Sequence, residues 1–187
     1  MRARRPESVK TESDMSQAVA CTLGKYAARE VRVRGCIFDV VAYNKKEKSF
    51  TLVESKRSKK LTGIGHAFGQ LAAYSAMIAT QGPQFLAAYH KKLTVPMHID
   101  EWMRATDNYR RFKVEFYVAL TDAACKQVPL LRSMKKILPD VGIIRVKSDG
   151  KCRRDIRLSG NKRDSELCHA NTTTIKIFRN QQSGSRP

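Results

Sequence analysis

Three residues on two neighbouring segments of this chain have the types and spacing that phosphate chemistry uses. Glu54 and Lys56 lie two positions apart in the apolar run "FTLVESKR", so on a β-strand both side chains point to one face. Asp39 lies in the preceding apolar run, "IFDVVAYN". The polar segment "NKKEKS" separates the two runs, which predicts an antiparallel hairpin with Asp39 on one arm and Glu54 and Lys56 on the other.

Two carboxylates on neighbouring strands can approach closely enough to hold one Mg²⁺ ion, which binds to a sparse set of oxygens and keeps several waters. Asp39 and Glu54 are the expected carboxylate ligands, and the backbone carbonyl of Ser55 is a third. Lys56 would lie beside the attacking water, where it could orient or deprotonate that water or stabilise charge on the phosphate. The alternative is a salt-bridged pair on a strand that leaves the core at Glu54.

The order of the segments "IFDVVAYN", "FTLVESKR" and "HAFGQLAAYSA" resembles the PD-(D/E)xK nuclease superfamily, which has the restriction-endonuclease-like fold. In this resemblance Asp39 matches the aspartate of the motif, Glu54 its second acid and Lys56 its lysine. Gln70 matches a glutamine on the following helix in many members. Glu12 matches the acid of the first helix in the subgroups that have one. The resemblance therefore implies that all five residues belong to one catalytic site.

The resemblance covers about residues 11–147, and three departures from the family pattern stand out. Phe38 replaces the proline that gives the motif its name, which is frequent among family members. Residues 82–111 lengthen the link between the glutamine helix and the next strand. The basic tail after Cys152 has no counterpart in the pattern. These two additions are where we expect substrate choice to be set.

The elements that must position these side chains follow from periodicity and turn signals. Thr11 and Asp14 form a potential capping box that begins a helix extending to about Arg29. We expect strands at 31–44 (with a bend at Gly35), 50–57, 112–122 and 141–149, and further helices at 63–80 and 126–138. This order, with two or three strands between the first two helices, predicts an α/β protein with a central mixed β-sheet flanked by helices. The resemblance narrows it to the restriction-endonuclease-like fold, with the element order α-β-β-β-α-β.

Composition divides the chain into three parts. Residues 1–10 are expected to form a basic disordered arm, and residues 11–150 the core domain, with 82–111 as an insertion or connector. Residues 151–187 form a basic C-terminal extension, with one strand candidate at 172–178 and a disordered end.

The charge of the chain indicates a polyanionic partner. The sequence has 36 Lys and Arg against 17 Asp and Glu, a net charge of +19 and a pI near 10.1. Such an excess favours nucleic acid over an anionic membrane. The expected phosphate contacts are Arg57, Lys59 and Lys60, which follow the second arm of the hairpin, together with Lys45 and Lys46 in its turn. The alternative for these residues is a solvated surface.

Other composition signals narrow the class of protein. No apolar run reaches the ~20 residues of a membrane span. The five cysteines are odd in number and lack a C-x-x-C pair, which favours free thiols in a cytoplasmic, intracellular protein over disulfides or zinc.

The sequence thus favours a Mg²⁺-dependent endonuclease, with Mn²⁺ as a substitute metal, that hydrolyses phosphodiester bonds in double-stranded or branched DNA. Two alternatives remain: a non-catalytic nucleic-acid-binding module on a nuclease fold, and an RNA-processing nuclease. A homodimer would suit double-strand cleavage because one such site cuts one strand, although nothing in the sequence demonstrates an interface.

Overall fold

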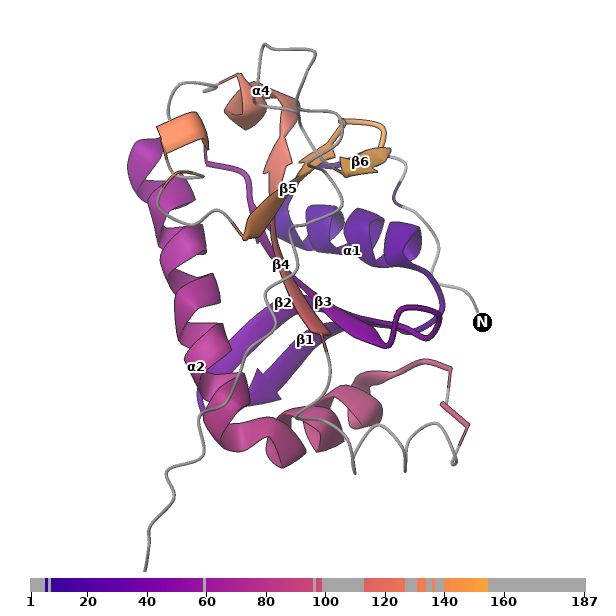
Figure 1. Ribbon diagram of the computed structural model, residues 1–187. Coiled ribbons are helices and arrows are strands. Elements are labelled where there is room, and N and C mark those ends of the chain that lie inside the picture. Colours follow the sequence, from indigo (N-terminus) through magenta and orange to yellow (C-terminus); the bar gives the residue numbers. More distant parts are fainter. Residues whose placement is uncertain are drawn as a thin grey trace, which may run out of the picture.

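A six-stranded mixed sheet is the centre of the fold (Figure 1). The computed structural model describes residues 6, 8–58, 60–95, 97, 98, 113–126, 131–133, 136 and 140–154. In chain order the elements are α1 (Glu12–Leu23), β1 (Ala27–Val33), β2 (Cys36–Asn44), β3 (Ser49–Lys56), α2 (Leu61–Lys92), β4 (Lys113–Thr121), α4 (Asp122–Cys125), β5 (Val141–Val146) and β6 (Cys152–Arg154).

The strands lie in the sheet in the order in which they occur along the chain, β1-β2-β3-β4-β5-β6. The pairs β1–β2, β2–β3 and β5–β6 are antiparallel, whereas β3–β4 and β4–β5 are parallel. Parallel neighbours need a crossover connection, and α2 lies in the connection from β3 to β4. The prediction of an α/β protein with a mixed sheet flanked by helices is therefore confirmed.

The two long helices cover opposite faces of the sheet. One apolar cluster includes Leu52 of β3 with Ile64 and Phe68 of α2, and the other includes Val53 of β3 with Val19 of α1. Leu52 and Val53 are neighbours that point to opposite faces, as the period of two in a strand requires. This alternation buries β3 on both faces and makes it the central strand of the core.

The first helix is shorter than expected. The capping box is confirmed: the Thr11 hydroxyl accepts from the Asp14 amide at 3.0 Å, and the Asp14 carboxylate accepts from the Thr11 amide at 2.8 Å. The helix then ends at Leu23 and not near Arg29, because Gly24 has φ +100° and donates its N–H to the Ala20 carbonyl. The chain turns there and enters β1.

The segment expected as one strand with a bend at Gly35 forms two antiparallel strands. Arg34 and Gly35 both have positive φ, +44° and +86°, and they separate the directly paired residues Val33 and Cys36. Two central residues with positive φ are the signature of the type I′ turn, whose twist matches that of the strands it joins. The bend is therefore a tight hairpin turn.

The segment 82–111, expected as an insertion or connector with a helical stretch at 84–93, begins as a continuation of the preceding helix, and its residues 99–111 lie outside the described residues. The backbone is non-helical at Gln81, two residues before Pro83, and α2 continues beyond this kink to Lys92. Proline causes such kinks because it lacks an N–H and its ring clashes with the preceding turn. Phe85, Leu86 and Tyr89 are buried in the same cluster as the first arm of α2, so this part of 82–111 belongs to the core.

Both ends of the core extend slightly further than expected. The Val9 amide donates to the Ser148 carbonyl at 2.9 Å and Val9 packs against the α1 cluster, so this part of the basic arm is held. Cys152–Arg154 form β6. The strand expected at 172–178, the end of the extension and most of the helix expected at 126–138 lie outside the described residues. Among the described helices, none has the length and apolarity to cross a membrane.

The hairpin turn predicts an asymmetry between two glycines. A Cβ added at Gly35 or Gly69 would meet no described atom within 4 Å, but only Gly35 has positive φ. We expect Gly35→Ala to destabilise the fold by about 1–2 kcal/mol through backbone strain. The control Gly69→Ala, in an exposed turn of α2, should stabilise it by up to about 1 kcal/mol. Urea unfolding measures both, and a shift of the same sign in both variants would contradict the turn assignment.

Candidate active site

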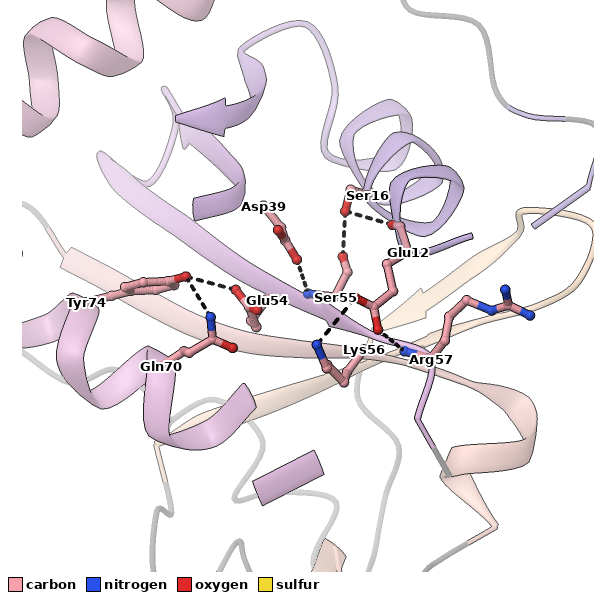
Figure 2. Close-up of polar contacts among 9 residues, drawn as sticks. All are labelled: Glu12, Ser16, Asp39, Glu54, Ser55, Lys56, Arg57, Gln70 and Tyr74. Carbon is pink, nitrogen blue, oxygen red and sulfur yellow. Dashed lines mark hydrogen bonds and ion pairs between the residues drawn. The ribbon is translucent and has the colours of Figure 1, made fainter. Parts of the chain in front are cut away.

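The predicted acids meet where β2 separates from β3. The ladder between these strands runs from Asn44↔Ser49 to Val40↔Val53 and ends there. Beyond it, the backbone N–H of Ser55 donates to Oδ2 of Asp39 at 2.8 Å, so a carboxylate takes the place of a strand carbonyl (Figure 2). The N–H and C=O of one strand residue point to the same side. The Ser55 carbonyl is therefore directed to the side on which Asp39 lies.

A local break in β2 directs Asp39 sideways. Phe38 belongs to the α2 cluster and Val40 to the α1 cluster, although residues two apart on a regular strand share a face. On the neighbouring strand, Glu30 lies between the pairs Arg29↔Val40 and Val31↔Phe38 and has φ +50°. At this point the alternation of side chains between the two faces of the sheet is interrupted in both strands. The change brings the Asp39 carboxylate to the edge of β3.

Glu54 is buried beneath α2. Glu54 is only 4% exposed, and the hydroxyl of Tyr74 donates to its Oε2 at 3.1 Å. That hydroxyl also contacts the Ile37 carbonyl, and the Gln70 side-chain amide donates to it at 3.5 Å. Figure 2 shows Tyr74 and Gln70 side by side on α2, facing Glu54. Gln70 therefore reaches the site through Tyr74.

The first helix supplies a partner for the lysine. Lys56 Nζ forms an ion pair with Oε2 of Glu12 at 3.3 Å, and Oε1 of Glu12 accepts from the Arg57 amide at 3.2 Å. The helix is fixed to β3 one turn later, where the Ser16 hydroxyl donates to the Ser55 hydroxyl at 3.0 Å. Glu12 thus joins the predicted residues through Lys56 (Figure 2).

Burial and neighbouring negative charges raise the pKa values of both acids. For Glu54, burial is the main cause and the charge of Asp39 adds to it, and together they raise the pKa to about 8 in spite of the Tyr74 hydrogen bond. For Asp39, burial again raises the pKa, while the Ser55 hydrogen bond opposes the rise. Two acids with raised pKa values in one site indicate that a positive charge would be stabilised between them.

The donor atoms fit a hard divalent cation. Two carboxylates and the Ser55 carbonyl form a sparse oxygen set of the kind that Mg²⁺ completes with water. The side-chain oxygen of Gln70 is buried without a hydrogen-bond partner among the described residues, so it is a further polar atom at the site that could accept from a bound water. In the part of the chain that the structure describes, no three His, Cys, Asp or Glu residues gather as a metal cluster. Any cation here would rest on the two acids.

The predicted phosphate contacts separate into two places. Arg57 and Lys60 are exposed on the segment that leaves β3, next to the site. Lys45 and Lys46 are also exposed, but they lie in the β2–β3 turn at the opposite end of the hairpin from Asp39. Lys59 lies outside the described residues. The structure therefore groups only part of this set with the acids.

Tyr74 is the residue of this site that the sequence did not indicate. It lies four residues after Gln70 on α2 and therefore on the same helix face, which is the only signal that could have identified it. A tyrosine in an apolar helical stripe is usually a core residue, and most of Tyr74 is core: its ring packs on Phe38 with centroids 4.3 Å apart. Only its hydroxyl belongs to the site.

Comparison with known proteins leaves the family open: no family model matches this chain, and neither the curated proteins nor the solved structures give a significant match.

The raised pKa of Glu54 predicts how stability depends on pH. The folded state holds the proton of Glu54 more tightly than the unfolded chain does. The contribution of this proton to the free energy of unfolding is therefore full below pH 4.5 and is lost as pH rises to about 8. Without metal, we expect Glu54→Gln to melt at a higher temperature than the wild type at pH 8.5, and to lose this advantage at pH 5. Calorimetric melting curves measure it. The control Glu47→Gln, in the exposed turn, should show no such difference, and equal pH profiles for wild type and Glu54→Gln would contradict the assignment.

The hydroxyl of Tyr74 has a separate test. Tyr74→Phe leaves the Glu54 carboxylate and the Ile37 carbonyl without this donor, which should cost about 1–3 kcal/mol of stability. Mn²⁺ binding, measured by titration calorimetry, should also weaken because Glu54 is less firmly held. The control Tyr89→Phe removes a hydroxyl that donates to the Tyr26 carbonyl, and it should lower stability without changing Mn²⁺ affinity. Equal Mn²⁺ affinities for Tyr74→Phe and the wild type would exclude the positioning role.

Proposed function

We propose that this protein is a Mg²⁺-dependent nuclease of the PD-(D/E)xK type that hydrolyses phosphodiester bonds in DNA. The observation that carries the proposal is that Asp39 lies against Ser55, the residue between Glu54 and Lys56, at the point where β2 leaves β3, and that its charge acts on Glu54. The sequence order of acid, acid and lysine on a hairpin agrees with this geometry. The α-β-β-β-α-β order of elements from α1 to β4 supports the restriction-endonuclease-like fold in the same way.

Each residue has a role that its contacts support. Asp39, Glu54 and the Ser55 carbonyl would hold the cation, and Mn²⁺ would substitute for Mg²⁺. When bound, such an ion stabilises negative charge on the phosphate and makes a water more acidic. Lys56 would, as an ammonium, orient the water and stabilise charge on the phosphate as the water oxygen bonds to phosphorus and the bond to the leaving oxygen breaks. The proton of the attacking water would pass to solvent, which would also protonate the leaving oxygen. Glu12 holds the Lys56 ammonium at the mouth of the site.

Two features favour a nucleic acid as the substrate. The net charge of +19 attracts polyanions over long distances. Arg57 and Lys60 are exposed directly beside the acids, where the phosphates that flank the cleaved one would lie. An RNA substrate would use the same contacts, and parallel assays on DNA and RNA of matched sequence decide between them. Whether a homodimer cuts both strands is tested by comparing nicked and linear plasmid products.

One observation favours a second candidate, a nucleic-acid-binding module that does not cut. The described residues contain no cluster of three metal-binding side chains, so the site relies on Asp39 and Glu54 alone. A module of this kind would bind DNA with strong salt dependence but would not bind Mn²⁺. Titration calorimetry with Mn²⁺ in the absence of DNA separates the two candidates.

The nuclease proposal predicts the loss of cleavage in two variants. Asp39→Ala removes a metal ligand, and Lys56→Ala removes the group beside the water. Either change should lower plasmid cleavage in Mg²⁺ or Mn²⁺ by at least about a hundredfold, as expected for a lost charge-stabilising group. Rates are measured from supercoiled plasmid on agarose gels.

Matched controls are Glu47→Ala and Lys92→Ala, which remove the same kinds of charge from exposed positions remote from the hairpin mouth. Both should cut at close to the wild-type rate. Unchanged cleavage in Asp39→Ala and Lys56→Ala would exclude this site as the source of the activity.

A further inference from the structure

A second basic feature lies at the other end of α1. A hollow of about 280 Å³ is lined there by four cationic residues: Lys25, Lys45, Lys46 and Arg154. None of the described residues that line it is acidic. Its lining also includes Leu23, the last residue of α1, and Thr51 of β3. Thr51 lies four residues before Ser55 and on the same face of the strand, so the hollow lies on the α1 side of the sheet.

Three separate segments hold the cations in place. The Asn44 side chain accepts from the backbone amides of Lys46 and Glu47 at 3.1 and 3.3 Å, which fixes the β2–β3 turn that carries Lys45 and Lys46. Arg154 lies on β6, and its guanidinium is 5.5 Å from the centroid of the Tyr117 ring.

Lys25 lies between α1 and β1, with its ammonium 4.7 Å from the centroid of the Tyr26 ring. The hollow is thus built from residues 23, 25 and 26, residues 42–46 and 51, and residue 154, which only the fold brings together.

The charge of the hollow identifies the class of ligand. Four cations that surround one space repel one another, and an anion between them would relieve that repulsion. The volume is sufficient for a phosphate together with part of its sugar. Lys25 and Arg154 lie against aromatic rings, an arrangement that leaves their charged groups accessible to a phosphate oxygen. A phosphodiester of a nucleic acid satisfies each of these conditions.

The length of helix α1 gives the distance between this hollow and the acidic site. Glu12, its first residue, contacts Lys56 at the site, and Leu23, its last, lines the hollow. Eleven residue steps of a helix span about 16 Å. A strand of duplex DNA advances 3.4 Å per phosphate along the axis and also winds round it, so two phosphates about 16 Å apart in space are about two to three nucleotides apart on one strand.

We propose that the hollow binds a phosphate of the same nucleic acid, about two to three nucleotides from the phosphate at the Asp39–Glu54 site. This inference rests on the proposed function and adds a second anchoring point to it. The anchor fixes how the strand lies along α1. Binding there requires a substrate that is long enough to reach both places.

The test compares two double variants by fluorescence anisotropy on a labelled 20-base-pair duplex, in Ca²⁺ so that binding is measured without Mg²⁺. Lys45→Ala/Lys46→Ala removes two cations from the hollow. Lys91→Ala/Lys92→Ala removes the same charge from the end of α2, a helix that packs on the opposite face of the sheet. The magnitude of the slope of log K against log [salt] should fall by about 0.9 in the hollow variant, because the contact with one phosphate is lost. The slope of the control should stay at the wild-type value.

Duplex length gives a second readout. Wild-type affinity should rise in a step once the duplex is long enough to extend about three base pairs past the acids, and the hollow variant should lack this step. Equal slopes for the hollow variant and the wild type, or equal losses in both double variants, would overturn the inference. Cleavage of plasmid by the wild type in Mg²⁺ tests the proposed function separately. If the wild type cuts DNA but the loss of Lys45 and Lys46 does not change binding, the proposed phosphate site in the hollow is refuted and the proposed function is not.

Discussion

The hydrogen bond from the Ser55 amide to the Asp39 carboxylate is the contact on which the rest of the site depends. A buried strand amide must have a partner, and here a side chain provides it where the β2–β3 ladder ends. The separation of the strands opens space beside Ser55 and at the same time orders Asp39 within it. Without this bond, β2 would have to continue its ladder, and Asp39 and Glu54 would have no shared opening.

Glu54 is a second buried acid in this opening, and its negative charge is only partly stabilised by its neighbours. Tyr74 gives Glu54 one hydrogen bond, and Lys56 is shared with Glu12, yet the Glu54 pKa still lies near 8. The two neighbouring carboxylates therefore lower the stability of the metal-free protein. Such destabilising pairs are common at sites where a bound cation or substrate balances the charge. The same burial that weakens the metal-free protein would strengthen its attraction for a divalent ion.

Much of this site could be predicted from the sequence, because a polar turn between two apolar runs fixes which residues share an arm. Asp39, Glu54 and Lys56 followed from that local pattern. Tyr74 did not, because its ring is a core group and only its hydroxyl is polar. The C-terminal end of α1 and the kink at Gln81 were not predicted, since they depend on backbone conformations at Gly24 and before Pro83 that periodicity does not encode. The basic hollow combines segments more than a hundred residues apart, a distance at which sequence patterns carry no information.

A crystal structure of the protein soaked with Mn²⁺ tests the central claim most directly. We predict one anomalous peak between Asp39 and Glu54, with carboxylate and Ser55 carbonyl oxygens at about 2.0–2.3 Å, close to the distances of hard divalent ions. Well-ordered acids without such a peak at millimolar Mn²⁺, or a peak only elsewhere on the surface, would contradict the account.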